Sequence, residues 1–218
     1  MATSDMRFPL YSPAERRFDQ IVHLIGVPAG MIAASWLLVE VCRTASPPLI
    51  ASMAVYAVGL IGMLSASAAY NLAPPGRTKE GLRRADHAMI FVMIAGSYTP
   101  FAMNALPPPE GVLLCVFIWT VAVAGIGLQL IFPRRFERVS LALYLGMGWA
   151  IVLVIRPLVE HLPPESLALL VAGGLVYSLG ALVHTRDRLK FHNAIWHVLV
   201  LVAAGLHVVA LYSAFLSA

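Results

Sequence analysis

Charge is scarce in this chain. Asp, Glu, Lys and Arg make up 12% of its 218 residues, and apolar residues make up 60%. Soluble domains carry about twice that share of charge, so a water-soluble protein is disfavoured. Cysteine is also rare, since only Cys42 and Cys115 occur. We expect two free thiols, although a single bridge between them stays topologically possible.

Several motifs are absent as well. The chain has no nucleophile elbow, phosphate loop or cysteine-pair motif, and no basic patch interleaved with aromatics, so nucleic-acid binding is not supported. It has no internal repeat, which argues against an inverted-repeat transporter. No polar linker is long enough to separate two domains. We therefore expect residues 1–218 to form a single integral membrane domain.

What the chain does have is long apolar runs. Each is long enough, or nearly so, to cross a hydrocarbon core of about 30 Å as a helix. They predict an all-α, seven-transmembrane-helix bundle with spans at about 20–42, 49–72, 86–106, 111–132, 139–155, 166–183 and 194–216.

Positive charge is sorted between the two ends of these spans. Of the 15 Lys and Arg, 13 fall in the leading segment and in the loops after spans two, four and six, and only Arg43 and Arg156 lie on the other side. The positive-inside rule then predicts a cytoplasmic N-terminus and an external C-terminus. We expect a multi-pass protein of the cell inner membrane whose partners are membrane lipids.

Four spans bring polar side chains to one depth near the predicted cytoplasmic face. Such groups are costly in hydrocarbon and indicate a site. In three pairs the two residues stand four positions apart, which places each pair on one helix face. The pairs are Asp19 with His23, Ser67 with Asn71, and Asn193 with His197. His192 stands five residues from His197, so both cannot point into one small site, and His207 lies roughly 15 Å deeper than His197. The candidates are Asp19, His23, Ser67, Asn71, Asp86, Asn193 and His197.

Each candidate also has a purely structural interpretation. Asp19 and His23 can form a mutual pair at the membrane boundary, and Asp86 can be the N-cap of its span. His197 can be a buried imidazole bonded to Asp86 or to an Asn. Ser67 can bond to its own helix's carbonyls, and His207 can be a packed polar residue.

The segments Asp86-His-Ala-Met-Ile-Phe-Val-Met-Ile-Ala-Gly-Ser-Tyr-Thr-Pro100, Ala194-Ile-Trp-His-Val-Leu-Val200 with His207, and His23-Leu-Ile-Gly26 resemble hemolysin III proteins. These are the bacterial branch of the progestin and adipoQ receptor family, which is similar in turn to alkaline ceramidases. The resemblance implies seven helices and a zinc ion near the cytoplasmic face. It also implies three histidine ligands, with a Ser and an Asp that help to hold a zinc-bound water.

The chain departs from that pattern at two of the three ligand positions. The family's Ser-x-x-x-His reads Ser67-Ala-Ala-Tyr-Asn71, and its His-x-x-x-His reads Asn193-Ala-Ile-Trp-His197. Ser67, Asp86 and His197 match. Zinc favours imidazole and thiolate, whereas an amide oxygen is a weak donor to it. Together Asn71, Asp86, Asn193 and His197 form an oxygen-rich set that suits a harder ion such as Mg²⁺ or Mn²⁺, or no metal. His192 is a conceivable replacement ligand if its span is overwound.

Three functions are compatible with this chain. The Asn substitutions favour a degenerate, non-catalytic member that binds a lipid or senses the membrane. The alternative is a metal-dependent lipid amide hydrolase, in which a metal-bound water would attack a carbonyl with Asp86 and Ser67 assisting. A pore-forming, haemolytic activity is implied by the family's name alone, and the sequence has no releasable amphipathic segment to support it.

Overall fold

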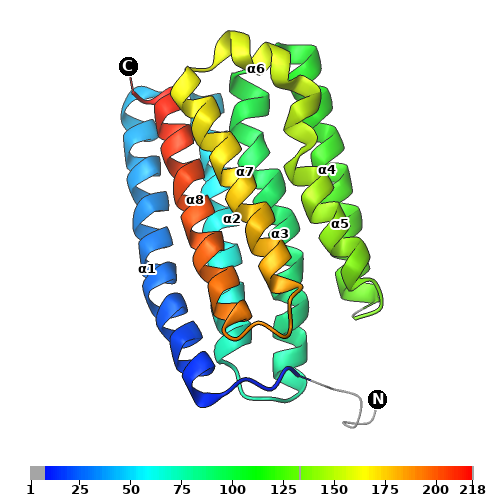
Figure 1. Cartoon of the computed structure of the whole chain (residues 1–218). Helices are drawn as coiled ribbons and strands as arrows, with labels where there is room; N and C mark the ends of the chain where they lie inside the picture. Colours follow the sequence, from blue (N-terminus) through cyan, green and yellow to red (C-terminus); the bar gives the residue numbers. More distant parts are fainter. Residues whose placement is uncertain (1–7, 133, 218) are drawn as a thin grey trace.

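The structure is a computed structural model that describes residues 8–132 and 134–217, and all regular elements in these ranges are helical. The predicted all-α class is confirmed. Figure 1 shows an upright bundle in which α1 begins and α8 ends at opposite ends. The helices are α1 (Pro13–Thr44), α2 (Pro47–Leu72), α3 (Arg77–Asn104), α4 (Pro108–Ile131), α5 (Glu137–Gly148), η2 (Ala150–Val154, a 3₁₀ helix), α6 (Ile155–His161), α7 (Pro164–His184) and α8 (His192–Phe215).

Proline and a capping box set several helix starts. Prolines open α1, α2, α4 and α7, where a missing N–H costs nothing and the fixed φ suits the first turn. At α1 the Ser12 side chain accepts from Glu15 N, and the Glu15 carboxylate accepts from Ser12 N at 2.9 Å. These reciprocal bonds satisfy two N-terminal donors, so the position at which α1 begins is well defined.

Six helical stretches of the described residues are long and apolar enough to cross a membrane, with α5 to α6 counted as one. The seventh expected span corresponds to α3, which falls outside that set and carries Arg77, Lys79, Arg83 and Arg84 in its first turns. The helix begins at Arg77 rather than near residue 86. Asp86 therefore lies inside a helix, and its interpretation as an N-cap is wrong.

The stretch expected as a continuous span over 139–155 is broken. α5 ends at Gly148, and the chain continues as the 3₁₀ segment Ala150–Val154. The Tyr98 hydroxyl lies at the break, 2.7 Å from Met147 O and 3.0 Å from Gly148 O, and accepts from Ile151 N at 2.8 Å. Because apolar surroundings offer backbone groups no water, this one side chain replaces the missing helical hydrogen bonds.

Small residues bring α2, α3 and α4 close together. A Cβ added at Gly59 would lie 3.3 Å from Met93 Cα, and one at Gly96 would lie 3.3 Å from Val55 O. A Cβ at Gly111 of α4 would meet the Ala102 carbonyl of α3. Close backbone approach of this kind is how membrane helices pack where water supplies no hydrophobic drive. Cys42 and Cys115 are both free thiols, as expected.

Candidate polar site at the basic end of the bundle

One end of the bundle carries the start of α1, the loops 73–76 and 185–191, and residues 134–136, which hold or flank most of the arginines. We call it the basic end. Near it, α1, α2, α3 and α8 direct polar side chains inward. We call the following set the polar cluster: Asp19, His23, Ser67, Asn71, Asp86, Asn193 and His197.

Asp19 is the hub of this cluster. Its Oδ1 lies 2.6 Å from His197 Nδ1, and its Oδ2 accepts from Asn193 Nδ2 at 3.3 Å. Its backbone carbonyl lies 2.8 Å from His23 Nδ1. The expected pairing of Asp19 with His23 thus runs mainly through the backbone, since the carboxylate is 3.8 Å away. His197 pairs with Asp19 rather than with Asp86 or an Asn, which corrects that expectation.

Ser67 lies between the two imidazoles. Its Oγ is 3.2 Å from His23 Nε2 and 3.5 Å from His197 Nε2. Asn71 Nδ2 lies 3.4 Å from the same oxygen. The Ser67 hydroxyl therefore joins α1, α2 and α8 instead of being occupied by a carbonyl of its own helix. The Asp86 side chain, 14% exposed, lines the same cavity as His23, Ser67 and His197.

The two asparagines turn their NH₂ groups into the network. Asn71 Nδ2 donates to Ser67 O at 3.0 Å, and Asn193 Nδ2 donates to the Asp19 carboxylate. Both partners can only accept, so the orientation of each amide is fixed. Asn71 Oδ1 in turn accepts from Asn193 Nδ2 at 3.3 Å. These positions are hydrogen-bond donors, and they do not fit the zinc that the family resemblance implies there.

Two further histidines lie outside the polar cluster. His192 Nδ1 is 2.9 Å from Leu189 O, and its ring packs against Tyr11 at 5.7 Å between centroids. Burial raises the pKa of the Tyr11 hydroxyl. His207 lies farther along α8, with its ring edge-on to Tyr177 at 5.5 Å. The structure therefore places neither residue in the polar cluster, and His207 lines the same cavity at a distance from it.

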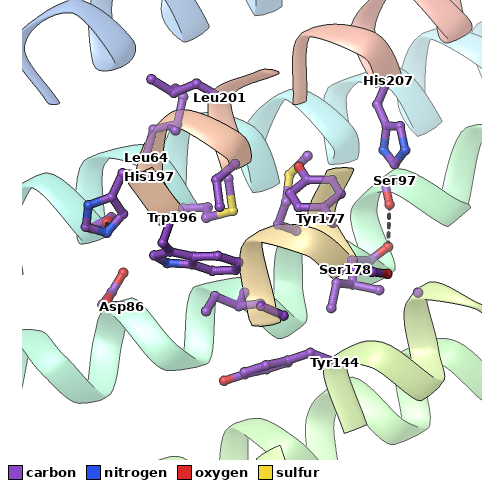
Figure 2. Close-up of a pocket in the computed structure, with 18 of the residues that line it drawn as sticks. Leu64, Asp86, Ser97, Tyr144, Tyr177, Ser178, Trp196, His197, Leu201 and His207 are labelled. Carbon is purple, nitrogen blue, oxygen red and sulfur yellow. Dashed lines mark hydrogen bonds between the residues drawn. The ribbon is translucent and has the colours of Figure 1, made fainter. Parts of the chain in front are cut away.

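The polar cluster opens into a cavity of about 1220 Å³, a volume that includes its open part. Figure 2 shows Asp86 and His197 at one end and His207 with Ser97 at the other. Between them the lining is mainly apolar, with aromatic rings from three helices in Tyr144, Tyr177 and Trp196. No sequence pattern marks these aromatic residues, because their spacing is that of ordinary packing residues.

A buried polar network that opens into an apolar cavity, inside a bundle of membrane-length helices, defines a multi-pass α-helical membrane protein with a candidate site near one end of the bundle. The chain belongs to the Haemolysin-III related family, whose sequence profile matches residues 14–208.

Two bacterial relatives match most of the chain. It is 34% identical to Hemolysin-3 of Bacillus cereus over 183 residues, which is 84% of each chain. It is 32% identical to the Hemolysin-3 homolog of Bacillus subtilis (strain 168) over 192 residues, 88% of this chain and 90% of the relative. The human monocyte to macrophage differentiation factor is 28% identical over 166 residues, 72% and 68% of the two chains. No solved structure matches.

Proposed function

We propose that this protein binds the hydrocarbon chain of a membrane lipid in its cavity and holds the lipid's polar group at the polar cluster, without the family's zinc chemistry. It acts as a degenerate, non-catalytic member that binds lipid or senses the membrane. It crosses the inner membrane seven times, with α3 as one span and the basic end in the cytoplasm. The 13 to 2 partition of Lys and Arg supports that orientation.

The observation that carries this proposal is the composition of the cavity. Small-molecule sites are mostly apolar and have a few convergent polar groups. This cavity is mainly apolar between its ends, and His23, Ser67, Asp86 and His197 line it at the polar cluster. Leu141, Tyr144 and Leu145 of α5 and Tyr177 of α7 line it, and we propose that a chain enters from the bilayer between these two helices.

The amide groups of the polar cluster favour binding over hydrolysis. A hydrolase that follows the family pattern needs imidazoles at residues 71 and 193 to hold zinc. Here those positions are amides whose NH₂ groups bond to Ser67, Asp19 and Asn71. The polar-cluster residues that line the cavity and can meet a lipid's polar group are His23, Ser67, Asp86 and His197. Asn71 and Asn193 are already bonded to each other, so the network is organised before a lipid arrives.

Lipid binding is tested by native mass spectrometry of the full chain and by crosslinking to a photoactivatable fatty acid. Gly174 lines the cavity, and a Cβ there would lie 3.8 Å from the Trp149 ring. Gly174→Leu should reduce crosslinking strongly. Gly127→Leu is the matched control, since a Cβ there meets nothing within 4 Å. Equal crosslinking of both variants would contradict a lipid in this cavity.

Two further measurements separate the parts of the proposal. Incubation with a fluorescent ceramide should release no fatty acid, and release that Asp86→Asn abolishes would establish the hydrolase instead. A reporter that is active only outside the cytoplasm should be active when fused to the C-terminus and inactive at the N-terminus. The reverse pattern would overturn the proposed orientation.

A further inference from the structure

The end of the cavity farthest from the polar cluster, which we call the far end, carries a histidine of its own. His207 lies roughly 15 Å along α8 from His197, and Figure 2 shows it across the cavity from Asp86. Gly173 of α7 leaves the space that its ring occupies, since a Cβ there would meet the imidazole. An ionisable side chain at this depth in a membrane bundle is costly, and it indicates a functional position.

The imidazole of His207 has one nitrogen to offer to the cavity. The ring interacts with the backbone carbonyl of Leu170 on α7. A carbonyl oxygen can only accept, so the ring nitrogen on that side carries the hydrogen. In the neutral ring the second nitrogen then presents a lone pair. No hydrogen bond in the described part of the chain uses this acceptor.

Two serines at the far end also present acceptors. Ser97 and Ser178 line the same cavity, and Figure 2 shows both toward His207. Ser97 Oγ donates to Ile94 O and Ser178 Oγ donates to Gly174 O, each at 2.8 Å. Both hydroxyl hydrogens are therefore used within their own helices, and lone pairs remain on the two oxygens.

The other two polar groups near the far end do not supply a free donor. Trp149 Nε1 donates to Ser178 Oγ at 3.0 Å. The Tyr177 ring lines the cavity, edge-on to His207 at 5.5 Å between centroids, but its hydroxyl oxygen is buried. These residues therefore give the far end a set of hydrogen-bond acceptors whose own hydrogens are already engaged or shielded.

We propose that the far end recognises a hydroxyl group on the acyl chain of the bound lipid, about 15 Å from the polar group held at the polar cluster. The hydroxyl donates its hydrogen to the free nitrogen of His207. This inference rests on the lipid binding proposed above, and it names the class of lipid as one with a hydroxylated chain. An unsubstituted chain leaves the His207 acceptor without a partner, which is costly in an apolar cavity.

The acceptor character of the far end makes the proposal specific. A ketone at the same place on the chain is also polar, but its oxygen can only accept. It would meet the lone pair of His207 and those of the two serines without a hydrogen between them. The far end should therefore select a hydrogen-bond donor, and a polar chain without a donor should gain nothing there.

The test compares stearic, 12-hydroxystearic and 12-oxostearic acid as competitors of a photoactivatable fatty acid, with the full chain in detergent. In an extended chain, carbon 12 lies at about the separation of His207 from the polar cluster. We expect the hydroxy acid to bind about 3- to 10-fold more tightly than stearic acid, the effect of one neutral hydrogen bond. The oxo acid should bind no more tightly than stearic acid.

His207→Leu should remove the preference for the hydroxy acid and leave the affinity for stearic acid nearly unchanged. Gly173→Ala should weaken the preference, because its Cβ displaces the imidazole without removing it. Tyr56→Phe is the matched control. It removes a buried hydroxyl that has no hydrogen-bond partner among the described residues and does not line the cavity, so the preference should persist. The Tm of each variant without ligand shows whether it folds.

Three outcomes would overturn the inference while leaving the proposed lipid binding intact. They are equal competition by stearic and 12-hydroxystearic acid in the wild type, an equal gain from the oxo acid, or an undiminished preference in His207→Leu. If none of the acids competes for the crosslink, the proposed lipid binding is wrong, and this inference is wrong with it.

Discussion

Two parts of this bundle have nearly equal mean hydropathy but very different degrees of burial. The apolar window of α2 has a mean hydropathy of 2.0 and is 44% buried, whereas the α5 to α6 stretch has 1.9 and is 17% buried. What differs is the placement of small residues. α2 and α3 meet at Gly59 and Gly96, while α5 itself buries only Ser140 and Met147. Hydropathy therefore decides that a helix enters the membrane, and small residues decide how tightly it packs there.

The tightly packed helices position the polar residues, and the loosely packed helix leaves space for the cavity. The close-packed α2 and α3 hold Ser67, Asn71 and Asp86 at fixed positions. The loosely packed α5 leaves room for the cavity that Tyr144 and Leu145 line. Three experiments measure this contrast, and we give them from the largest expected effect to the smallest.

Gly111→Ala should destabilise the protein by about 3 kcal/mol, the upper end for overpacking. Its Cβ would meet the backbone carbonyl of Ala102, which cannot turn aside as a side chain can. Unfolding in a denaturing detergent measures the change. Gly127→Ala in the same helix is the control, because nothing lies within 4 Å of its Cβ. It should gain up to about 1 kcal/mol from helix propensity, and equal losses in the two variants would contradict close α3–α4 packing.

Tyr98→Phe should cost about 2 kcal/mol, because it leaves backbone groups at the α5 break without a partner. The same unfolding assay applies, and hydrogen exchange should speed up at Ile151. Tyr56→Phe is the matched control. The Tyr56 hydroxyl is buried and has no hydrogen-bond partner among the described residues, so its removal should be neutral or slightly stabilising. A Tyr98 variant as stable as this control would show that the break does not depend on the hydroxyl.

The smallest effect concerns the link between Trp149 and Ser178 across the cavity. Trp149 Nε1 donates to Ser178 Oγ at 3.0 Å, and interhelical hydrogen bonds in membranes contribute about 0.6 kcal/mol on average. A double-mutant cycle of Trp149→Phe and Ser178→Ala should return a coupling of that size. Coupling above about 2 kcal/mol would exceed the largest such value in membranes, and α5 would then be held far more firmly than its packing indicates.

Much of this architecture could be predicted from the chain alone. The apolar runs gave the helices to within a few residues at most ends, and the spacing of four placed Ser67 with Asn71 and Asn193 with His197 on common faces. The break after Gly148 was missed. Its cause is a hydroxyl on another helix, that of Tyr98, and no local pattern encodes this contact.

The partner of His197 was missed for the same reason. Spacing along one helix shows which residues share a face, but it does not show which helix turns a carboxylate toward that face. Asp19 and Asp86 both lie at the predicted depth of His197, so either could have been its partner. The packing of α1 against α8 makes Asp19 the partner. The signal available in the sequence was the matching depth of Asp19 and His197 on the first and last spans.

The bond between Asp19 and His197 can form only late in synthesis of the chain. These residues are 178 positions apart, and at synthesis rates of about 5–20 residues per second roughly 10 to 35 s separate their emergence from the ribosome. During that interval the Asp19 carboxylate enters the membrane with α1 before its principal partner exists. The newly inserted α1 must therefore remain near water, lipid headgroups or the insertion machinery until α8 arrives, and a chain truncated before α8 leaves this acid without His197 and Asn193.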